Sequence, residues 1–277
     1  MMYQSPLVVI KIGGEIVLDT RQCQGLVHNI QSLLDANWQV VMLHGGGVQI
    51  TTLQNQLGRE STKIEGRRIT TAGDLQIVKQ VIAGEVNVDL VATLINGGIN
   101  AFGFHGASAQ LISATRREPM LFPSCGKHAI DLGEVGDVVS IRSSIISTLL
   151  DEGMVPVIAS LGIDPHGCIL NINADTTAVK LATALSADLL LFVTAIGGVY
   201  HDINDFQSRV SVLPQSLARK LTDREVIQGG MIPKITEAFN ALASTVGRVA
   251  ILSAASKGAF LSIANGNINY GTTLFID

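Results

Sequence analysis

Two lysines and one aspartate occupy positions where their charges require partners. Lys11 lies near the end of the apolar run LVVIKI at residues 7–12, a pattern typical of a buried parallel strand. Lys234 falls in the first turn of an expected helix, where its charge opposes the helix dipole. A buried ammonium group without an anion is strongly unfavourable, so each lysine calls for a carboxylate or a bound phosphate. Asp175, just before an alanine-rich helix, can supply a carboxylate for both.

Glycine-rich turns recur at strand or helix ends, at Gly13-Gly14, Gly45-Gly46-Gly47, Gly197-Gly198 and Gly229-Gly230. The order strand, glycines, helix points bare backbone N–H groups at an anion. Neither the GxxxxGK[ST] loop nor the GxGxxG fingerprint occurs. The turns therefore indicate an anion site without identifying a nucleotide by themselves.

This set of groups suits phosphoryl transfer, in which catalysis is mostly positioning and fixed positive potential. The sequence holds no GxSxG, no HExxH, and no cysteine with a plausible histidine beside it. If the acceptor is itself a carboxylate, with a pKa of about 4.3, it is already ionised at neutral pH and needs no general base.

Each candidate residue also has a purely structural explanation. Lys11 could extend its charge into solvent from a strand end. Asn173 and Asp175 could serve only as the cap and first turn of their helix. Arg68 is either a surface arginine or a planar fork for a substrate carboxylate. Asn171 is harder to explain structurally, because it adds a third polar group at one strand end.

Composition narrows the class of protein. The 277 residues have a net charge of -4 and only 4% aromatic side chains, which argues against nucleic acid as a partner. No apolar segment reaches the roughly 18 residues of a membrane span, and no signal peptide is visible. Three well-separated cysteines without a CxxC pair fit a reducing cytoplasm and predict no metal site.

The elements that must position these groups alternate along the chain. Strands are expected near residues 7–12, 40–43, 99–104, 155–159, 188–194, 248–252 and 272–276, with helices between them. This order predicts an α/β fold with one parallel-rich sheet covered on both faces. We further expect an exposed loop at 61–66, a helix break at Gly84, and residues 133–137 leading into a helix that carries Ile141 and Ile145.

The ordered strings VVIKIGG, HGGG, GRRITTAGDLQIV with AGEVN, NINADTTA, FVTAIGGV and GGMIPK resemble the amino acid kinase family over residues 7–271. The resemblance implies a three-layer αβα sandwich around an open, mainly parallel eight-stranded sheet. It implies a lobe at 1–170 for an acylated amino acid and for dimerisation, and a lobe at 171–277 for the nucleotide. The implied reaction moves the γ-phosphoryl group of ATP, carried with Mg²⁺, to the side-chain carboxylate of N-acetyl-L-glutamate in arginine biosynthesis.

The resemblance also implies residue roles. Lys11 and Lys234 would stabilise the transferred phosphoryl group, and Asp175 would orient both lysines. Backbone N–H groups of glycines would cradle phosphate and substrate, Arg68 would bind the α-carboxylate, and Asn171 the acetamido group. The cradling glycines are Gly13, Gly14, Gly45 and Gly46, and the nucleotide would be lined by Thr194, Gly197, Gly198, Val199, Gly230 and Met231.

The sequence departs from the family pattern at Ala195, where an aspartate is usual, at residues 104–108 and at residues 253–257. Two other functions stay open: a kinase for the longer acylated aminoadipate, and a non-catalytic binding protein of the same fold. Since six residues before the first strand cannot form an additional helix, we expect an arginine-insensitive homodimer.

Overall fold

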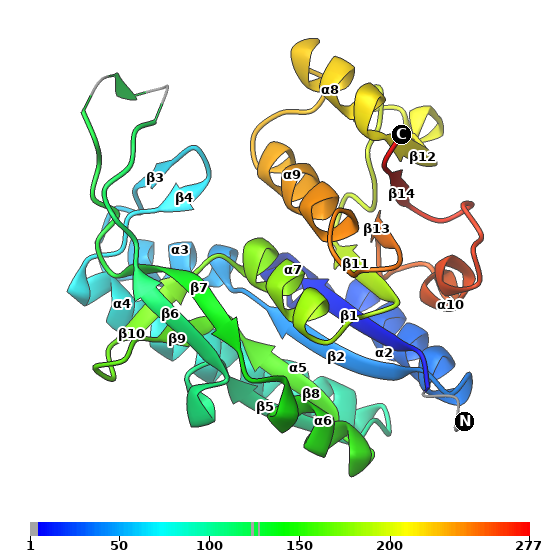
Figure 1. The fold of residues 1–277 in the computed structure, drawn as a ribbon, viewed down its shortest axis with the longest axis horizontal. Coiled ribbons are helices and arrows are strands. Elements are labelled where there is room, and N and C mark those ends of the chain that lie inside the picture. Colours follow the sequence, from blue (N-terminus) through cyan, green and yellow to red (C-terminus); the bar gives the residue numbers. More distant parts are fainter. Residues whose placement is uncertain (1–4, 123–124, 127) are drawn as a thin grey trace.

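An eight-stranded sheet forms the centre of the protein. The computed structural model describes residues 5–122, 125–126 and 128–277. The strand order is β12-β14-β13-β11-β1-β2-β8-β5, and only the β13–β14 pair is antiparallel (Figure 1). The strands are β1 Leu7–Ile12, β2 Gln39–His44, β5 Ala101–His105, β8 Val155–Ala159, β11 Leu189–Val193, β12 Val212–Pro214, β13 Val249–Leu252 and β14 Thr272–Phe275. The predicted α/β class and mainly parallel eight-stranded sheet are confirmed.

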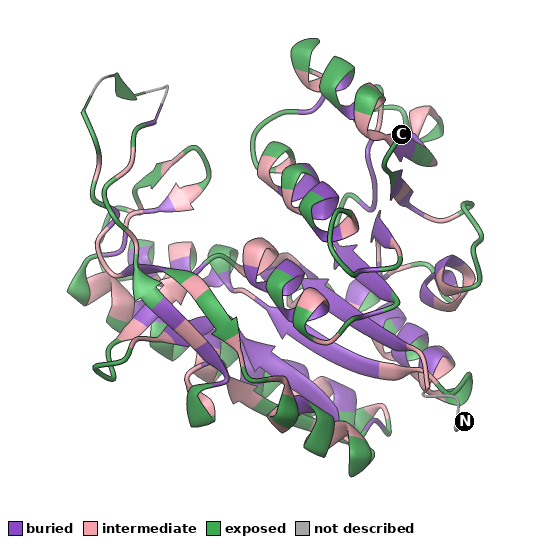
Figure 2. Cartoon of the chain, in the orientation of Figure 1, coloured by how far each residue is buried: buried purple, intermediate pink, exposed green. Residues whose placement is uncertain are grey.

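Helices pack on both faces of this sheet, so its strands are the most buried part of the chain (Figure 2). The α-helices of the described residues are α1 Gly14–Val17, α2 Thr20–Asp35, α3 Gly47–Gln56, α4 Ala72–Lys79, α5 Asn87–Asn96, α6 Ser143–Asp151, α7 Ala174–Ala184, α8 Gln215–Asp223, α9 Met231–Leu242 and α10 Ala259–Ala264, with short 3₁₀ turns at Ser108–Gln110 and Phe206–Ser208. The three-layer sandwich follows from this arrangement.

Alternation along β1 determines where Lys11 points. Val8, Ile10 and Ile12 belong to the core cluster shared with α2 and α10, whereas Leu7 and Val9 belong to the cluster shared with α7 and α9. Side chains two residues apart in a strand lie on the same face. Lys11 therefore faces α7 and α9, the helices that carry Asp175 and Lys234.

A smaller closed barrel flanks the sheet, built from β6 Ile112–Arg116, β7 Val135–Ile141, β9 Leu161–Ile163 and β10 Ile169–Ile172. The prediction that residues 133–137 lead directly into a helix was wrong, because β7 intervenes before α6. Its sequence VGDVVSI pairs with both β6 and β10, and these long-range pairings are not visible in local periodicity.

Two further expectations, for residues 61–66 and for Gly84, were wrong. Residues 61–66 are not a plain loop, since β3 Lys63–Ile64 pairs with β4 Arg67–Arg68. The helix that begins after the Thr71 cap does not break at Gly84: α4 Ala72–Lys79 runs through the π-helical segment Gln80–Val86 into α5 Asn87–Asn96. The i→i+5 hydrogen bonding of the π-helical segment continues the helix through Gly84 into α5.

Within the described residues, no helix is both long and apolar enough to cross a membrane. The expected boundary after residue 170 falls inside β10, a strand of the barrel. Helices α8, α9 and α10 all follow that point and surround the β11 to β14 half of the sheet (Figure 1).

Candidate active site

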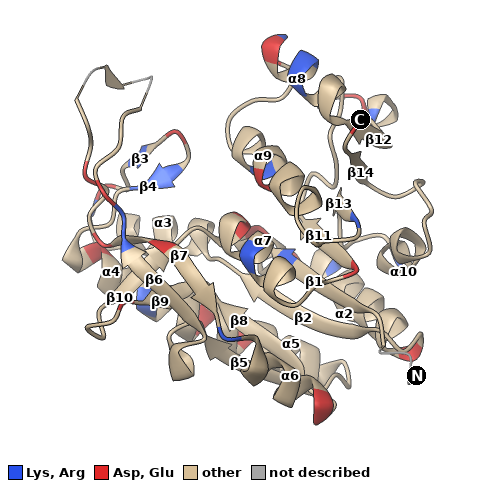
Figure 3. Ribbon diagram, in the orientation of Figure 1, with Lys and Arg blue, Asp and Glu red and all other residues tan. Residues whose placement is uncertain are grey.

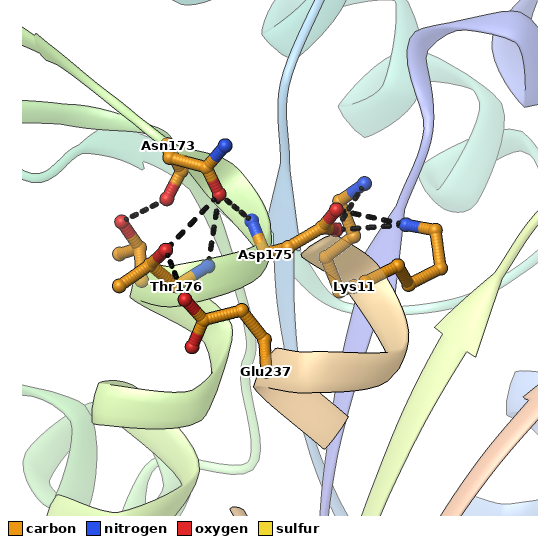
Figure 4. A network of polar contacts seen from close by, with 7 residues as sticks. Lys11, Asn173, Asp175, Thr176 and Glu237 are labelled. Carbon is orange, nitrogen blue, oxygen red and sulfur yellow. Dashed lines mark hydrogen bonds and ion pairs between the residues drawn. The ribbon is translucent and has the colours of Figure 1, made fainter. Parts of the chain in front are cut away.

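Lys11 and Lys234 converge on Asp175. Lys11 Nζ lies 2.7 Å from Asp175 Oδ1, and Lys234 Nζ lies 2.9 Å from each carboxylate oxygen. Figure 4 shows Lys11 reaching Asp175 from β1 at the start of α7. Lys11 and Asp175 thus meet in the site although more than 160 positions separate them in the sequence.

Asn173 fixes the start of α7 and with it Asp175. The Asn173 Oδ1 accepts hydrogen bonds from the Asp175 N–H at 2.9 Å and the Thr176 N–H at 3.0 Å. Thr176 in turn donates its hydroxyl hydrogen to Glu237 of α9 at 2.9 Å (Figure 4). The predicted cap at Asn173 is confirmed, and it gives the carboxylate a fixed direction.

The electrostatics of the cluster follow from its burial. Burial alone would raise the pKa of Asp175, but the charges of Lys11 and Lys234 lower it to about 2. Burial and the charge of Lys11 lower the pKa of Lys234 to about 8, against the opposing effect of Asp175. Burial would also lower the pKa of Lys11, but Asp175 outweighs it and the pKa is raised. At neutral pH the cluster holds two cations and one anion, which leaves one net positive charge.

A pocket of about 360 Å³ opens in front of this cluster. The predicted residues that line it are Lys11, Gly13, Gly14, Gly45, Gly46, Arg68, Asn171 and Asp175. The glycine turns after β1 and β2 thus form one wall of a single pocket at the carboxyl edge of the sheet, where ligands of open α/β folds bind. The Gly13 N–H itself donates to the Val193 carbonyl at 3.3 Å.

Arg68 is a buried pocket residue and not a surface arginine. Its Nη2 donates to the Gly47 carbonyl at 3.0 Å and to Thr51 Oγ1 at 2.9 Å, and its Nη1 donates to Gln54 and Ser61. These bonds hold the guanidinium in place and engage its terminal N–H groups. Asn171 donates from Nδ2 to Thr70 Oγ1 at 3.0 Å, which fixes its amide at the pocket edge.

Sequence reasoning missed three further cations in the pocket wall, Lys63, Arg67 and Arg117. Burial lowers the pKa of Lys63, and the neighbouring charge of Arg68 lowers it further. Burial likewise lowers the pKa of Arg67, with a second contribution from Arg117. Arg117 is paired with Asp137, whereas Lys63 and Arg67 lie beside other cations, and such an excess of positive charge around one pocket favours an anionic occupant. The dense basic stretch from Lys63 to Arg68 (Figure 3), in a chain of net charge -4, was the available signal.

The predicted nucleotide residues do not line this pocket, although they lie at the same edge of the sheet. Thr194 directly follows β11, whose Val193 is paired with Ile12 of β1. The Thr194 hydroxyl accepts a hydrogen bond from the Gly197 N–H at 3.0 Å, and the Val199 N–H donates to Thr272 Oγ1 at 2.8 Å. Gly198 is buried in the same turn, whereas Gly230 is exposed one turn before Lys234, at the start of α9 beside Met231.

These features define an α/β protein that presents converging cations and glycine turns to an anion at the carboxyl edge of a parallel sheet. The model of the amino acid kinase family matches residues 6–253, and the chain belongs to this family.

Similar proteins agree with this assignment. A protein named acetylglutamate kinase from Anaeromyxobacter dehalogenans (strain 2CP-C) is 40% identical over 267 residues, which are 96% of this chain and 98% of that protein. One of the same name from Methanococcus aeolicus is 36% identical over 91% of this chain and 85% of its own length. The crystal structure of smu.665 from Streptococcus mutans UA159 superposes with a TM-score of 0.79 at 29% identity, covering 98% of this chain and 99% of that one.

Proposed function

We propose that the protein is an acetylglutamate kinase, which transfers the γ-phosphoryl group of ATP to the side-chain carboxylate of N-acetyl-L-glutamate in arginine biosynthesis. The observation that carries the proposal is the convergence of Lys11 and Lys234 on Asp175 beside the pocket. The name shared by relatives that are 36–41% identical over about nine-tenths or more of the chain supports it.

In this proposal the phosphoryl group migrates between the two lysines. Lys11, on the pocket side, neutralises charge near the attacking carboxylate, and Lys234, at the first turn of α9, neutralises charge near the leaving group. Asp175 holds both ammonium groups in place, so no reorganisation is needed when charge develops. The acceptor carboxylate is ionised at neutral pH and attacks without a general base.

The substrate would lie against the barrel side of the pocket. Arg68 and Asn171 are its proposed partners there. The α-carboxylate would displace one of the acceptors that now engage the terminal N–H groups of Arg68, and the acetamido group would bind Asn171. The nucleotide would lie over the turns at 194–199 and 229–231, where Gly229 and Gly230 leave open space. Mg²⁺ bound to the nucleotide would offset phosphate charge. The surplus positive charge of the lysine cluster and the pocket cations fits such an anion.

The test is ADP release from ATP with acetylglutamate and with acetylated aminoadipate as acceptors. We expect turnover with acetylglutamate, and a clear preference for it over the longer homologue. One methylene is worth about 1–3 kcal/mol of discrimination, so the ratio of kcat/KM values must be measured directly. Turnover with aminoadipate alone would favour the alternative substrate, and no turnover with either would favour a binding protein.

Replacing Arg68 with glutamine should raise KM for acetylglutamate about 10- to 100-fold, because a charge-assisted hydrogen bond contributes about 1.5–3 kcal/mol. KM for ATP should change by less than about 3-fold, since the nucleotide is proposed to bind elsewhere. Arg116→Gln is the matched control: Arg116 is exposed and pairs with exposed Asp131. Steady-state kinetics would contradict the role if both variants gave the same KM for acetylglutamate.

We also propose a homodimer formed along β5. This strand ends the sheet order, so within the part of the chain that the structure describes one of its edges has no partner strand, and Phe102 on it is exposed. Val88 and Ile95 of α5, a helix that packs beside β5, are exposed as well. Light scattering should give the mass of two chains, and Phe102→Lys should shift it towards one chain. The exposed loop variant Ile203→Lys should leave the mass unchanged.

A further inference from the structure

His44 is a buried residue to which the proposed reaction assigns no role. It is the last residue of β2, has no exposed surface, and directly precedes the glycine turn at 45–47. Its Nε2 lies 2.9 Å from Asn87 Nδ2, and its Nδ1 lies 2.9 Å from the Gly45 carbonyl oxygen. An imidazole that contacts a strand, a helix and the pocket loop can fix the geometry of that loop.

The hydrogen-bond directions follow from the partners. Asn87 Nδ2 also donates to the Val157 carbonyl at 3.0 Å, which identifies it as the amide nitrogen. Since an amide nitrogen only donates, Nε2 of His44 must accept and Nδ1 must carry the hydrogen. Nδ1–H therefore donates to the Gly45 carbonyl. Burial lowers the pKa of His44 to about 4, which agrees with a neutral ring.

This bond sets the orientation of the next peptide unit. In a planar trans peptide the C=O and N–H bonds point in opposite directions. With the Gly45 carbonyl held towards the His44 ring, the Gly46 N–H is directed away from it. Among the residues that the structure describes, this N–H has no hydrogen-bond partner, and Gly46 lines the pocket.

The π-helical segment holds the same glycine from the other side. A Cβ atom on Gly46 would lie 3.3 Å from Ile82 and Val86 and 3.5 Å from Val81, all within Gln80–Val86. Asn87, the partner of His44, directly follows this segment. One continuous helical element thus packs against Gly46 and orients the ring that fixes Gly45, and π-helical turns are frequent at functional sites.

We propose that His44, held by Asn87, is a positioning residue that aims the Gly46 N–H at the charge developing on the transferred phosphoryl group. The inference rests on the proposed kinase function and adds a residue to it. His44 touches neither substrate in this arrangement and acts only through the peptide between Gly45 and Gly46.

Two amide variants separate this role from simple packing. His44→Asn places an amide donor near the position of Nδ1 and keeps the bond to Gly45, whereas His44→Gln reaches the Nε2 position and contacts Asn87 only. We expect His44→Gln to lower kcat about 10- to 100-fold, approaching the loss of one oxyanion donor. His44→Asn should stay within about 3-fold of the unaltered chain, and KM for both substrates should change little. Packing alone predicts the reverse order, because asparagine leaves the larger void, so equal or reversed losses would overturn the proposal.

A second readout does not depend on turnover. In the ¹⁵N-labelled protein, inorganic phosphate should shift the Gly46 amide resonance in the unaltered chain and in His44→Asn, but not in His44→Gln. If the unaltered chain shows this shift yet does not phosphorylate acetylglutamate, the proposed function fails while the role of His44 stands. Absence of the shift in the unaltered chain overturns that role. Should either histidine variant fail to fold, the near-isosteric Asn87→Leu must show the loss of kcat expected for His44→Gln.

Discussion

Replacing Asp175 with asparagine should lower kcat by about 10³-fold and destabilise the fold by about 3 kcal/mol. Asp175 is the shared partner of two buried ammonium groups, at 2.7 Å from Lys11 and 2.9 Å from Lys234. Breaking a buried ion pair by removing one partner typically costs about 3–5 kcal/mol, and loss of a proton from one lysine offsets part of this. Activity falls further than stability alone explains, because the lysines lose the group that directs them at the phosphoryl group.

Asp175→Asn should also change how the free energy of unfolding depends on pH. Asp175 has a pKa of about 2 in the folded protein, below its ordinary value of 3.8. Its stabilising contribution is therefore complete above about pH 5 and is lost progressively as the pH falls through 3.8 towards 2. In Asp175→Asn this part of the acid sensitivity should be absent. Denaturant unfolding at pH 7 and at pH 3 measures it.

Asp35→Asn is a suitable control, because Asp35 is exposed at the end of α2. We expect its free energy of unfolding to change by less than about 0.5 kcal/mol and its kcat to remain normal. An Asp175→Asn protein with normal kcat would refute the assigned role of the carboxylate.

The parts of the site that could be predicted are those with local signals. The strand LVVIKI, the glycine turn behind it and the cap at Asn173 follow from residue type and spacing, and the structure has all three. That Asp175 could serve both Lys11 and Lys234 followed from the need of buried ammonium groups for an anion, and the family resemblance supplied the role, since no local pattern relates residues so far apart. The structure shows why it happens: side-chain alternation along β1 turns Lys11 towards α7 and α9.

The parts that could not be predicted depend on tertiary pairing. β7 was mistaken for the approach to a helix because the apolar residues of α6 extend its pattern backwards to Ile141. The π-helical segment has no spacing rule, and Gly84 within it suggested an end. Lys63 and Arg67 reach the pocket only because β3 and β4 form a hairpin, and two-residue strands leave no periodic trace.

Replacing Lys234 with methionine should separate activity from stability. We expect kcat to fall about 10²- to 10³-fold, because a fixed positive charge near the leaving group is lost. KM for ATP should rise only a few-fold, since the glycine turns remain. Lys220→Met is the control, because Lys220 is exposed on α8 and should show normal kinetics.

In Lys234→Met the free energy of unfolding should not fall together with kcat. The pKa of Lys234 is lowered from 10.5 to about 8 by burial and by the charge of Lys11, so the charged form is unfavourable in the folded state at pH 7. Between about pH 8 and 10.5 the unfolded chain binds more protons than the folded chain, and the free energy of unfolding should rise with pH. Lys234→Met removes this rise and should be as stable as the unaltered chain at pH 7, or more stable.

Lys11→Met provides the opposite case within the same cluster. The pKa of Lys11 is raised by Asp175, so its charge stabilises the folded state below pH 10.5, and that contribution is lost only as the pH rises beyond this value. Its loss should lower both kcat and the free energy of unfolding at pH 7. Two lysines share one carboxylate at 2.7 and 2.9 Å, so the buried cluster carries one positive charge that no protein anion balances. A phosphoryl group beside the lysines would supply the missing negative charge, and it stabilises the transition state to the extent that this charge grows during transfer.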